Sequence, residues 1–166
     1  KVISITNSTI KKHNIKRNEG TKRTVAYIGP DEEYKGYFDF LEFTKKIDLS
    51  KYQINTYGHF PNEFAPAYIE QKGRFSQDQL GKVYSEIDYL IIPSRWKETF
   101  GLVTLEALSF GVNVFVSENV GAKDLVDSAH RFRTLEEVDL NTGLGVTKRI
   151  ETLDNHVRNL QNLYLN

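Results

Sequence analysis

Short apolar segments alternate with amphipathic segments along most of this chain, and no other feature limits its possible folds as strongly. Strands buried on both faces of a parallel sheet read as continuous apolar runs, with helices as the crossovers between them. The sequence therefore predicts an α/β fold with a doubly wound parallel sheet, a Rossmann-like arrangement. The predicted strands are residues 24–29, 52–58, 88–94 and 112–117, with a weaker one at 2–6.

The segments between these strands carry apolar residues at the spacing of an amphipathic helix. Ser76 followed by Gln79 is a capping-box pair, which marks the start of one helix. Gly111 suits the end of another, because glycine readily adopts the left-handed conformation that often follows a helix. The predicted helices are residues 37–47, 76–87, 101–110 and 153–164, with a short one in 120–126.

Composition narrows the class of protein. The chain has 166 residues, enough for one domain with a substantial core. Its 22 basic and 22 acidic residues give no net charge, which argues against a dedicated nucleic-acid binder. The absence of cysteine excludes disulfides and thiolate metal sites. No apolar run approaches the roughly 18 residues of a membrane span. Because the chain starts at Lys1 and has no methionine, it is expected to be part of a longer protein.

The turn after the first central strand leads to Lys35 and Gly36 at the start of a helix. Ligands of doubly wound sheets bind outside the carboxyl ends of the strands, and helix N-termini bind anions through free N–H groups. A lysine beside such a helix end reaches a phosphate as a mobile charge. The spacing is not that of a P-loop, and the alternative interpretation is an ordinary solvated lysine.

Two glutamates, Glu98 and Glu106, lie in residues 93–111. Eight helical residues turn about 800°, which would leave the two carboxylates roughly 80° apart, so a shared helical face does not explain the spacing. Residues 99–101 instead resemble the turn into the helix, with Glu98 in the loop before it. The first backbone N–H groups of the helix are then free for an anion, namely those of Gly101, Leu102 and Val103.

Glu106 is predicted to lie about two turns inside this helix. Its neighbours three and four positions away are mostly apolar: Leu102, Val103, Ser109 and Phe110. Burying a carboxylate costs free energy unless a polar group pairs with it, so we expect Glu106 to face a ligand pocket. The alternative is an acid that reaches solvent and is favoured by the helix dipole.

Two further loops hold weaker candidates. Arg74 and Phe75 are placed to border a nucleobase, although such residues more often only shape a loop. Gly121, before the short predicted helix, offers backbone N–H groups at the same edge of the sheet. Asp124 is as consistent with a surface charge as with a ligand. The four histidines are scattered without metal-ligand spacing, and His59, after a strand end, is interpreted as structural.

The run PSRWKETFGLVTLEAL, residues 93–108, resembles the signature of retaining glycosyltransferases of group 1 (family 4), which have the GT-B fold. Two glutamates separated by seven residues, with F-G-L between them and E-A-L at the end, make the match fairly specific. Supporting matches in the family's order are Lys35-Gly36, residues 72–80 and residues 120–126. The resemblance covers residues 24–130 well.

GT-B enzymes have two Rossmann-like domains with the active site between them, and this chain resembles the C-terminal, donor-binding one. The resemblance implies that residues 1–23 are an interdomain strand and linker. It also implies that residues 24–166 form the nucleotide-sugar-binding domain and that the acceptor domain is absent from this chain. Alone, the chain is therefore expected to be the inactive donor half.

The resemblance also implies a role for each matching residue. Glu98 would face the donor sugar near its 3-hydroxyl, and Glu106 would hold both ribose hydroxyls. Lys35 and the backbone around Leu102 and Val103 would hold the diphosphate. Arg74 and Phe75 would border the base. No metal and no cofactor are expected, because a cation and a helix end can stabilise the leaving diphosphate.

The implied activity is transfer of a hexose with retention from a UDP- or GDP-sugar to a glycan, lipid or protein acceptor, in bacterial polysaccharide biosynthesis. The acceptor would be read mainly by the absent domain, and no nucleic acid is expected as a partner. The implied location is cytoplasmic, including peripheral contact with the inner membrane face through that domain.

One position departs from the family pattern. An arginine usually follows the strand-end glycine, whereas this chain has Pro30 and then the acidic residues 31–33. Arg95 is a candidate replacement for that arginine. The departure keeps open a second class of function, a catalytically weakened GT-B accessory module that acts by protein interaction. A third possibility is a nucleotide-sugar epimerase, which product analysis without acceptor would identify.

Overall fold

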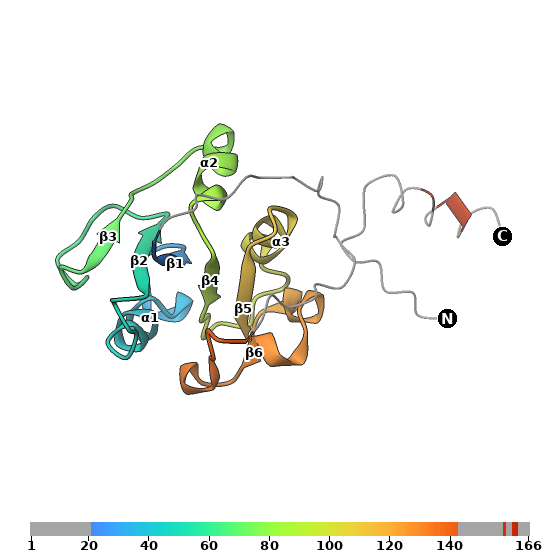
Figure 1. Cartoon of the computed structure of the whole chain (residues 1–166). Helices are drawn as coiled ribbons and strands as arrows, with labels where there is room; N and C mark the ends of the chain where they lie inside the picture. The colour runs from blue at the N-terminus through green and yellow to red at the C-terminus, as the bar shows by residue number, and fades with distance from the viewer. Residues whose placement is uncertain (1–20, 143–157, 159–160, 163–166) are drawn as a thin grey trace.

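Six parallel strands form one sheet in the computed structural model, which describes residues 21–142, 158 and 161–162 (Figure 1). Their order is β3-β2-β1-β4-β5-β6, so the chain builds outward from β1 and then returns to continue on its other side. The predicted doubly wound parallel sheet is confirmed. The strands are β1 (Arg23–Ile28), β2 (Tyr52–Tyr57), β3 (Ile69–Gln71), β4 (Tyr89–Ile92), β5 (Asn113–Ser117) and β6 (Arg131–Phe132).

Helices cover both faces of this sheet, α1 on one face and α2 and α3 on the other (Figure 1). Five short 3₁₀ segments complete the connections. The α-helices are α1 (Tyr37–Thr44), α2 (Leu80–Ser85) and α3 (Leu102–Ser109). The 3₁₀ segments are η1 (Glu33–Lys35), η2 (Gln77–Gln79), η3 (Gly121–Leu125), η4 (Ser128–His130) and η5 (Leu135–Glu137).

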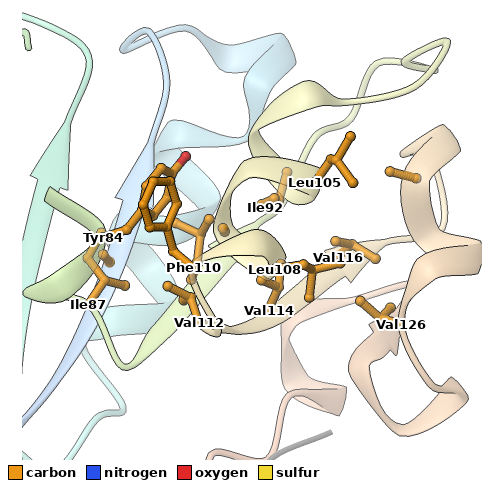
Figure 2. Packing of buried hydrophobic residues seen from close by; sticks show 14 of the residues in the cluster. Tyr84, Ile87, Ile92, Leu105, Leu108, Phe110, Val112, Val114, Val116 and Val126 are labelled. Carbon is orange, nitrogen blue, oxygen red and sulfur yellow. The ribbon is translucent and has the colours of Figure 1, made fainter. Parts of the chain in front are cut away.

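Two apolar clusters form the core, one on each face of the sheet. Successive side chains of β1 alternate between them, since Val25 and Tyr27 join the α1 side and Ala26 joins the other. Figure 2 shows the cluster beneath α2 and α3, where the ring of Tyr84 stacks on that of Phe110. Burial on both faces explains why the central strands are apolar runs in the sequence.

The predicted elements are present within the described residues, most of them a few residues shorter than expected. The capping-box bond forms, since the Ser76 N–H donates to Gln79 Oε1 at 2.9 Å, but it starts a 3₁₀ turn before α2. The predicted helix in 120–126 is the 3₁₀ segment η3. Strands β3 and β6 were missed because three and two residues are too short to show a pattern. The predicted strand at 2–6, most of the linker 1–23 and nearly all of helix 153–164 lie outside the described residues.

No helix in the described part of the chain is long and apolar enough to cross a lipid bilayer.

The connection from β1 to α1 passes directly over the end of β4. Gly36, between η1 and α1, has a φ of 75°, and a Cβ there would lie 2.0 Å from the carbonyl oxygen of Pro93. Main-chain atoms are therefore in contact at this point, and only glycine fits. This contact fixes the loop of Lys35 against the loop that follows β4.

Gly36→Ala is expected to lower the free energy of unfolding by about 2–5 kcal/mol, because it adds a main-chain clash to the cost of the left-handed conformation. Gly73→Ala is the matched control, since Gly73 has a similar φ of 78° but nothing within 4 Å of its Cβ position. The control should lose only about 1–2 kcal/mol. Denaturant unfolding of both variants measures the difference, and equal losses would contradict the role of the Pro93 contact.

Candidate functional site

The loops after β1 and β4 meet at the point where the strand order reverses, which is where open α/β sheets bind ligands. Lys35 comes from the first loop and Glu98 from the second, and Lys35 Nζ lies 2.9 Å from Glu98 Oε1. Their side chains are 30% and 15% exposed, so the ion pair is partly screened from water yet reachable. The structure thus brings together two predicted site residues 63 positions apart.

The loop after β5 holds the Glu98 loop in place. The Glu98 N–H donates to the Asn119 carbonyl at 3.0 Å, and the Gly121 N–H donates to the Glu98 carbonyl at 3.1 Å. A Cβ on Gly121 would lie 2.2 Å from the Thr99 carbonyl oxygen, so the two main chains are in direct contact. Gly121 therefore supports the site loop rather than presenting a separate anion site. Asp124 pairs with Arg131 at 3.1 Å, which fits a surface charge.

Helix α3 begins next to the Glu98 carboxylate. Gly101, the residue before the helix, has a φ of 87°, and a Cβ there would lie 3.4 Å from Glu98 Oε2. The Thr104 N–H donates to the Gly101 carbonyl at 3.0 Å. Within the described residues the N–H groups of Leu102 and Val103 have no acceptor. The helix start therefore presents free donors and the positive end of its dipole beside the ion pair.

Glu106 lies one turn further along α3 and is only partly buried. Its Oε2 accepts a hydrogen bond from the Tyr84 hydroxyl at 3.1 Å. Burial, and then the charge of Glu106, raise the pKa of Tyr84 above its ordinary value, so this hydroxyl keeps its proton and donates. The ring of Tyr84 is held by stacking on Phe110 at a centroid distance of 5.0 Å. The Tyr84 hydroxyl of α2 is thus one polar partner of the Glu106 carboxylate, and within the described residues the other carboxylate oxygen is left for a ligand.

Tyr84, a residue of the candidate site through its contact with Glu106, was not predicted from the sequence. It was interpreted only as one apolar position in the helical spacing before β4. A tyrosine at a core position needs a partner for its hydroxyl, and that requirement was the available signal. The sequence gives no indication that the partner would be Glu106, because the contact joins two helices packed side by side on the sheet.

Arg74 and Phe75 lie beyond the end of β2, on the far side of β1 from the ion pair. The guanidinium of Arg74 lies 4.5 Å from the centre of the exposed Phe60 ring. Phe75 packs edge-on against Tyr57 and borders the same apolar cluster as Val103 of α3. Phe75 therefore helps to shape its loop, while Arg74 remains at the surface.

The position of the family's usual arginine is occupied by Pro30, which has no charged side chain. The Pro30 carbonyl accepts from the Tyr27 hydroxyl at 2.7 Å. Arg95 is already paired with two carboxylates, Asp39 at 2.6 Å and Glu33 at 2.7 Å. Its guanidinium is therefore directed to η1 and α1, and no contact between Arg95 and the Lys35–Glu98 pair is observed within the described residues.

His59 is buried, as expected for a structural residue. Its ring contacts those of Tyr27 and Tyr37, and its Nδ1 lies 2.9 Å from the Gly29 carbonyl oxygen. Within the described residues no three acidic or histidine side chains converge in the manner of metal ligands.

A cavity of about 480 Å³ opens at the ends of β4, β5 and β6 on the α1 side of the sheet. Ser94, Ser117, Asn119 and Arg133 are among its lining residues. Lys35, Glu98 and Glu106 are not among them, so this cavity does not contain the ion pair.

Similar proteins identify the family. The model of a family described as "Glycosyl transferases group 1" matches residues 8–158. A Klebsiella pneumoniae protein described as an uncharacterized 41.2 kDa protein in the cps region is 28% identical over 151 residues. The match covers 89% of this chain and 40% of that relative.

Solved structures show the same fold. Anabaena HepE, in complex with UDP and glucose, matches with a TM-score of 0.68 and 13% identity, over 88% of this chain and 49% of that chain. The C-terminal domain of the group 1 glycosyl transferase LpcC from Francisella tularensis matches with a TM-score of 0.60 and 16% identity. That match covers 77% of this chain and 83% of the LpcC domain.

This chain spans less than half the length of the Klebsiella and Anabaena proteins, and its sheet is the Rossmann-like half of a GT-B architecture. The match to the family model extends over most of its residues and includes both glutamates of the E-x7-E pair. The chain belongs to the group 1 glycosyl transferases.

Proposed function

We propose that this chain binds the nucleotide-sugar donor of a retaining glycosyltransferase that works without metal. The observation that carries the proposal is the Lys35–Glu98 ion pair at the reversal of strand order, beside the free N–H groups at the start of α3. Family membership supports it, as do the Anabaena structures, which contain UDP with glucose or UDP-glucose.

The diphosphate of the donor is assigned to Lys35 and to the N–H groups of Leu102 and Val103. These groups offer positive charge and aligned donors at one place, where charge develops as the bond from the sugar to the phosphate breaks. Transfer forms a bond from the sugar to the acceptor oxygen, and the acceptor proton leaves with the diphosphate. Before transfer, Glu98 accepts a hydrogen bond from a hydroxyl of the donor sugar and so positions the sugar ring.

The nucleoside is assigned to the α2–α3 side of the site. Glu106 has two acceptor oxygens, which suit two neighbouring ribose hydroxyls, and Tyr84 fixes one of those oxygens. The base, of a UDP- or GDP-sugar, is assigned to the loop of Arg74 and Phe75. That loop borders the same apolar cluster as the start of α3.

The acceptor is proposed to be a glycan, lipid or protein bound by a further domain. The Klebsiella relative belongs to a cps region, which favours polysaccharide biosynthesis in a bacterium. The chain's zero net charge disfavours a nucleic-acid acceptor.

One observation favours a second candidate, a GT-B accessory module with weakened catalysis. Pro30 replaces the usual arginine, and Arg95 is committed to Asp39 and Glu33, so Lys35 is left as the cation at the ion pair. An assay for turnover of UDP- and GDP-sugars by the longer protein that carries this chain distinguishes an active transferase from an accessory module. Absence of turnover, together with a partner enzyme that requires this protein, would favour the accessory module.

Glu106→Ala is expected to weaken UDP binding about 10–100-fold, because it removes two hydrogen bonds from hydroxyls to a charged acceptor. Titration calorimetry of the chain with UDP measures this, with GDP as the alternative nucleotide. Glu42→Ala is the control, since Glu42 is an exposed acid on α1 that pairs with Lys45. Equal nucleotide affinity in wild type and Glu106→Ala would count against the proposed ribose site.

Tyr84→Phe keeps the ring stack but removes the donor to Glu106, so UDP affinity should fall a few-fold. Stability should also fall by about 1 kcal/mol. Tyr57→Phe is the matched control, because Tyr57 also donates to a glutamate, Glu86, at 3.3 Å. The control should show a similar stability loss with unchanged UDP affinity. A loss of affinity in both variants would mean that the effect is general rather than local to Glu106.

Lys35→Ala is expected to weaken UDP binding about tenfold while leaving uridine binding unchanged, because only UDP carries the diphosphate. UDP affinity of the wild type should be the same with EDTA and with added magnesium. Lys45→Ala, at an exposed position directly after α1, is the control. An affinity that depends strongly on magnesium would refute the metal-free part of the proposal.

A further inference from the structure

Two exposed aromatic side chains stand together beside the proposed donor site. Tyr34 comes from the loop after β1 and is 47% exposed, and Trp96 comes from the loop after β4 and is 65% exposed. Their ring centroids lie 6.5 Å apart at an interplanar angle of 75°. Tyrosine and tryptophan are enriched at binding surfaces, and the roles assigned so far use neither of these two side chains.

Both rings are held on a rigid backbone. The N–H groups of Arg95 and Trp96 donate to the Tyr34 carbonyl at 3.0 and 3.1 Å, which ties the two loops together. The Ser94 hydroxyl donates to the Trp96 carbonyl at 3.1 Å. Arg95 is anchored by the carboxylates of Asp39 and Glu33. A ligand therefore meets a surface whose main chain is already ordered, which reduces the entropy cost of binding.

The hollow in front of the rings combines apolar faces with hydrogen-bonding groups. It is shallow and widely open to solvent, and it is lined by Glu32, Glu33, Tyr34, Arg95 and Trp96. The carboxylates accept hydrogen bonds, and the guanidinium and tyrosine hydroxyl donate them. A sugar ring has the complementary surface, because its C–H groups form an apolar face and its hydroxyls surround the edge.

Charge argues for an uncharged ligand. Glu32 and Glu33 face the hollow, and the one arginine there is compensated by Asp39 and Glu33. A phosphate would therefore meet net negative charge. A nucleobase is also disfavoured, because the loop proposed for the base lies beyond β2, on the other side of β1.

The hollow adjoins the site of transfer. Lys35 Nζ lies 5.9 Å from the centre of the Tyr34 ring and 2.9 Å from Glu98. A ring stacked on Tyr34 and Trp96 is thus next to the groups assigned to the diphosphate and the donor sugar.

We propose that Tyr34 and Trp96 form a stacking platform for an uncharged sugar ring of the acceptor, with Glu32 and Arg95 binding its hydroxyls. The inference rests on the proposed function, because it assigns the acceptor side of the same reaction. It makes the acceptor a glycan, and it gives this chain a part in recognising it.

Trp96 is the only tryptophan in the chain, so tryptophan fluorescence reports on this platform alone. The chain is titrated with methyl β-galactopyranoside, maltotriose and glucuronate, each with and without saturating UDP. The neutral sugars should shift the emission to shorter wavelength in a saturable way, because stacking removes the indole from water. Glucuronate, which carries a carboxylate, should bind at least several-fold more weakly.

Sugar binding to variants is measured by ligand-observed saturation-transfer NMR, because the Trp96 variants lack the fluorescent side chain. Trp96→Ala and Tyr34→Ala should each weaken binding of the neutral sugars tenfold or more, and Trp96→Phe should restore most of it. Phe64→Ala is the matched control, since Phe64 is a 59% exposed aromatic elsewhere on the surface. UDP affinity should be unchanged in the Trp96 variants and in Phe64→Ala.

The outcomes separate this inference from the proposed function. Failure of wild type to bind UDP or GDP refutes donor binding, whatever the sugars do. Nucleotide binding without any fluorescence response to the neutral sugars refutes the platform alone. A parallel loss of UDP and sugar binding in Trp96→Ala also refutes it, because the rings would then belong to the donor site. Unaltered sugar binding in both alanine variants would place the sugar elsewhere.

Discussion

The arrangement of the site depends on one close approach of main chains, where Gly36 lies against the carbonyl of Pro93. No side chain fits between the two loops, so the connection after β1 and the connection after β4 have a single relative position. Lys35 reaches Glu98 because of that position, and Tyr34 accepts the hydrogen bonds that hold Trp96 for the same reason. A second contact of this kind, between Gly121 and Thr99, braces the Glu98 loop from the side of β5.

The sheet was predictable because strands that are buried on both faces are largely apolar in sequence. Strands β1, β4 and β5 are mostly apolar or β-branched, whereas β2 also carries Gln53 and Asn55, and the helices between them show their own periodicity. The edge strands β3 and β6 show no such pattern, because a strand of two or three residues at an edge buries few side chains. Several strand ends were overestimated because the predicted ranges included the turn residues that follow the strands, such as Gly29, Gly58 and Pro93.

The site was predictable only in part. The residue types and spacing of the E-x7-E segment indicated Glu98 and Glu106, and the turn after β1 indicated Lys35. The contact between Lys35 and Glu98 spans 63 positions and exists only because the two strands are neighbours in the sheet. The same limit applies to Tyr84, whose hydroxyl meets Glu106 across two packed helices, and to Arg95, whose carboxylate partners lie on η1 and α1.

The contact between Gly36 and Pro93 has a consequence for how such a protein can diversify. Because it joins main-chain atoms, the exposed side chains of Trp96 and Lys97 do not contribute to it, whereas the Arg95 side chain also joins the two loops through Glu33 and Asp39. Substitutions of Trp96 and Lys97 can alter what the surface recognises while the geometry of the neighbouring ion pair is kept. Under the proposed roles, the residue that stacks on the acceptor sugar and the residue that positions the donor sugar are two positions apart in one loop, yet they can evolve independently.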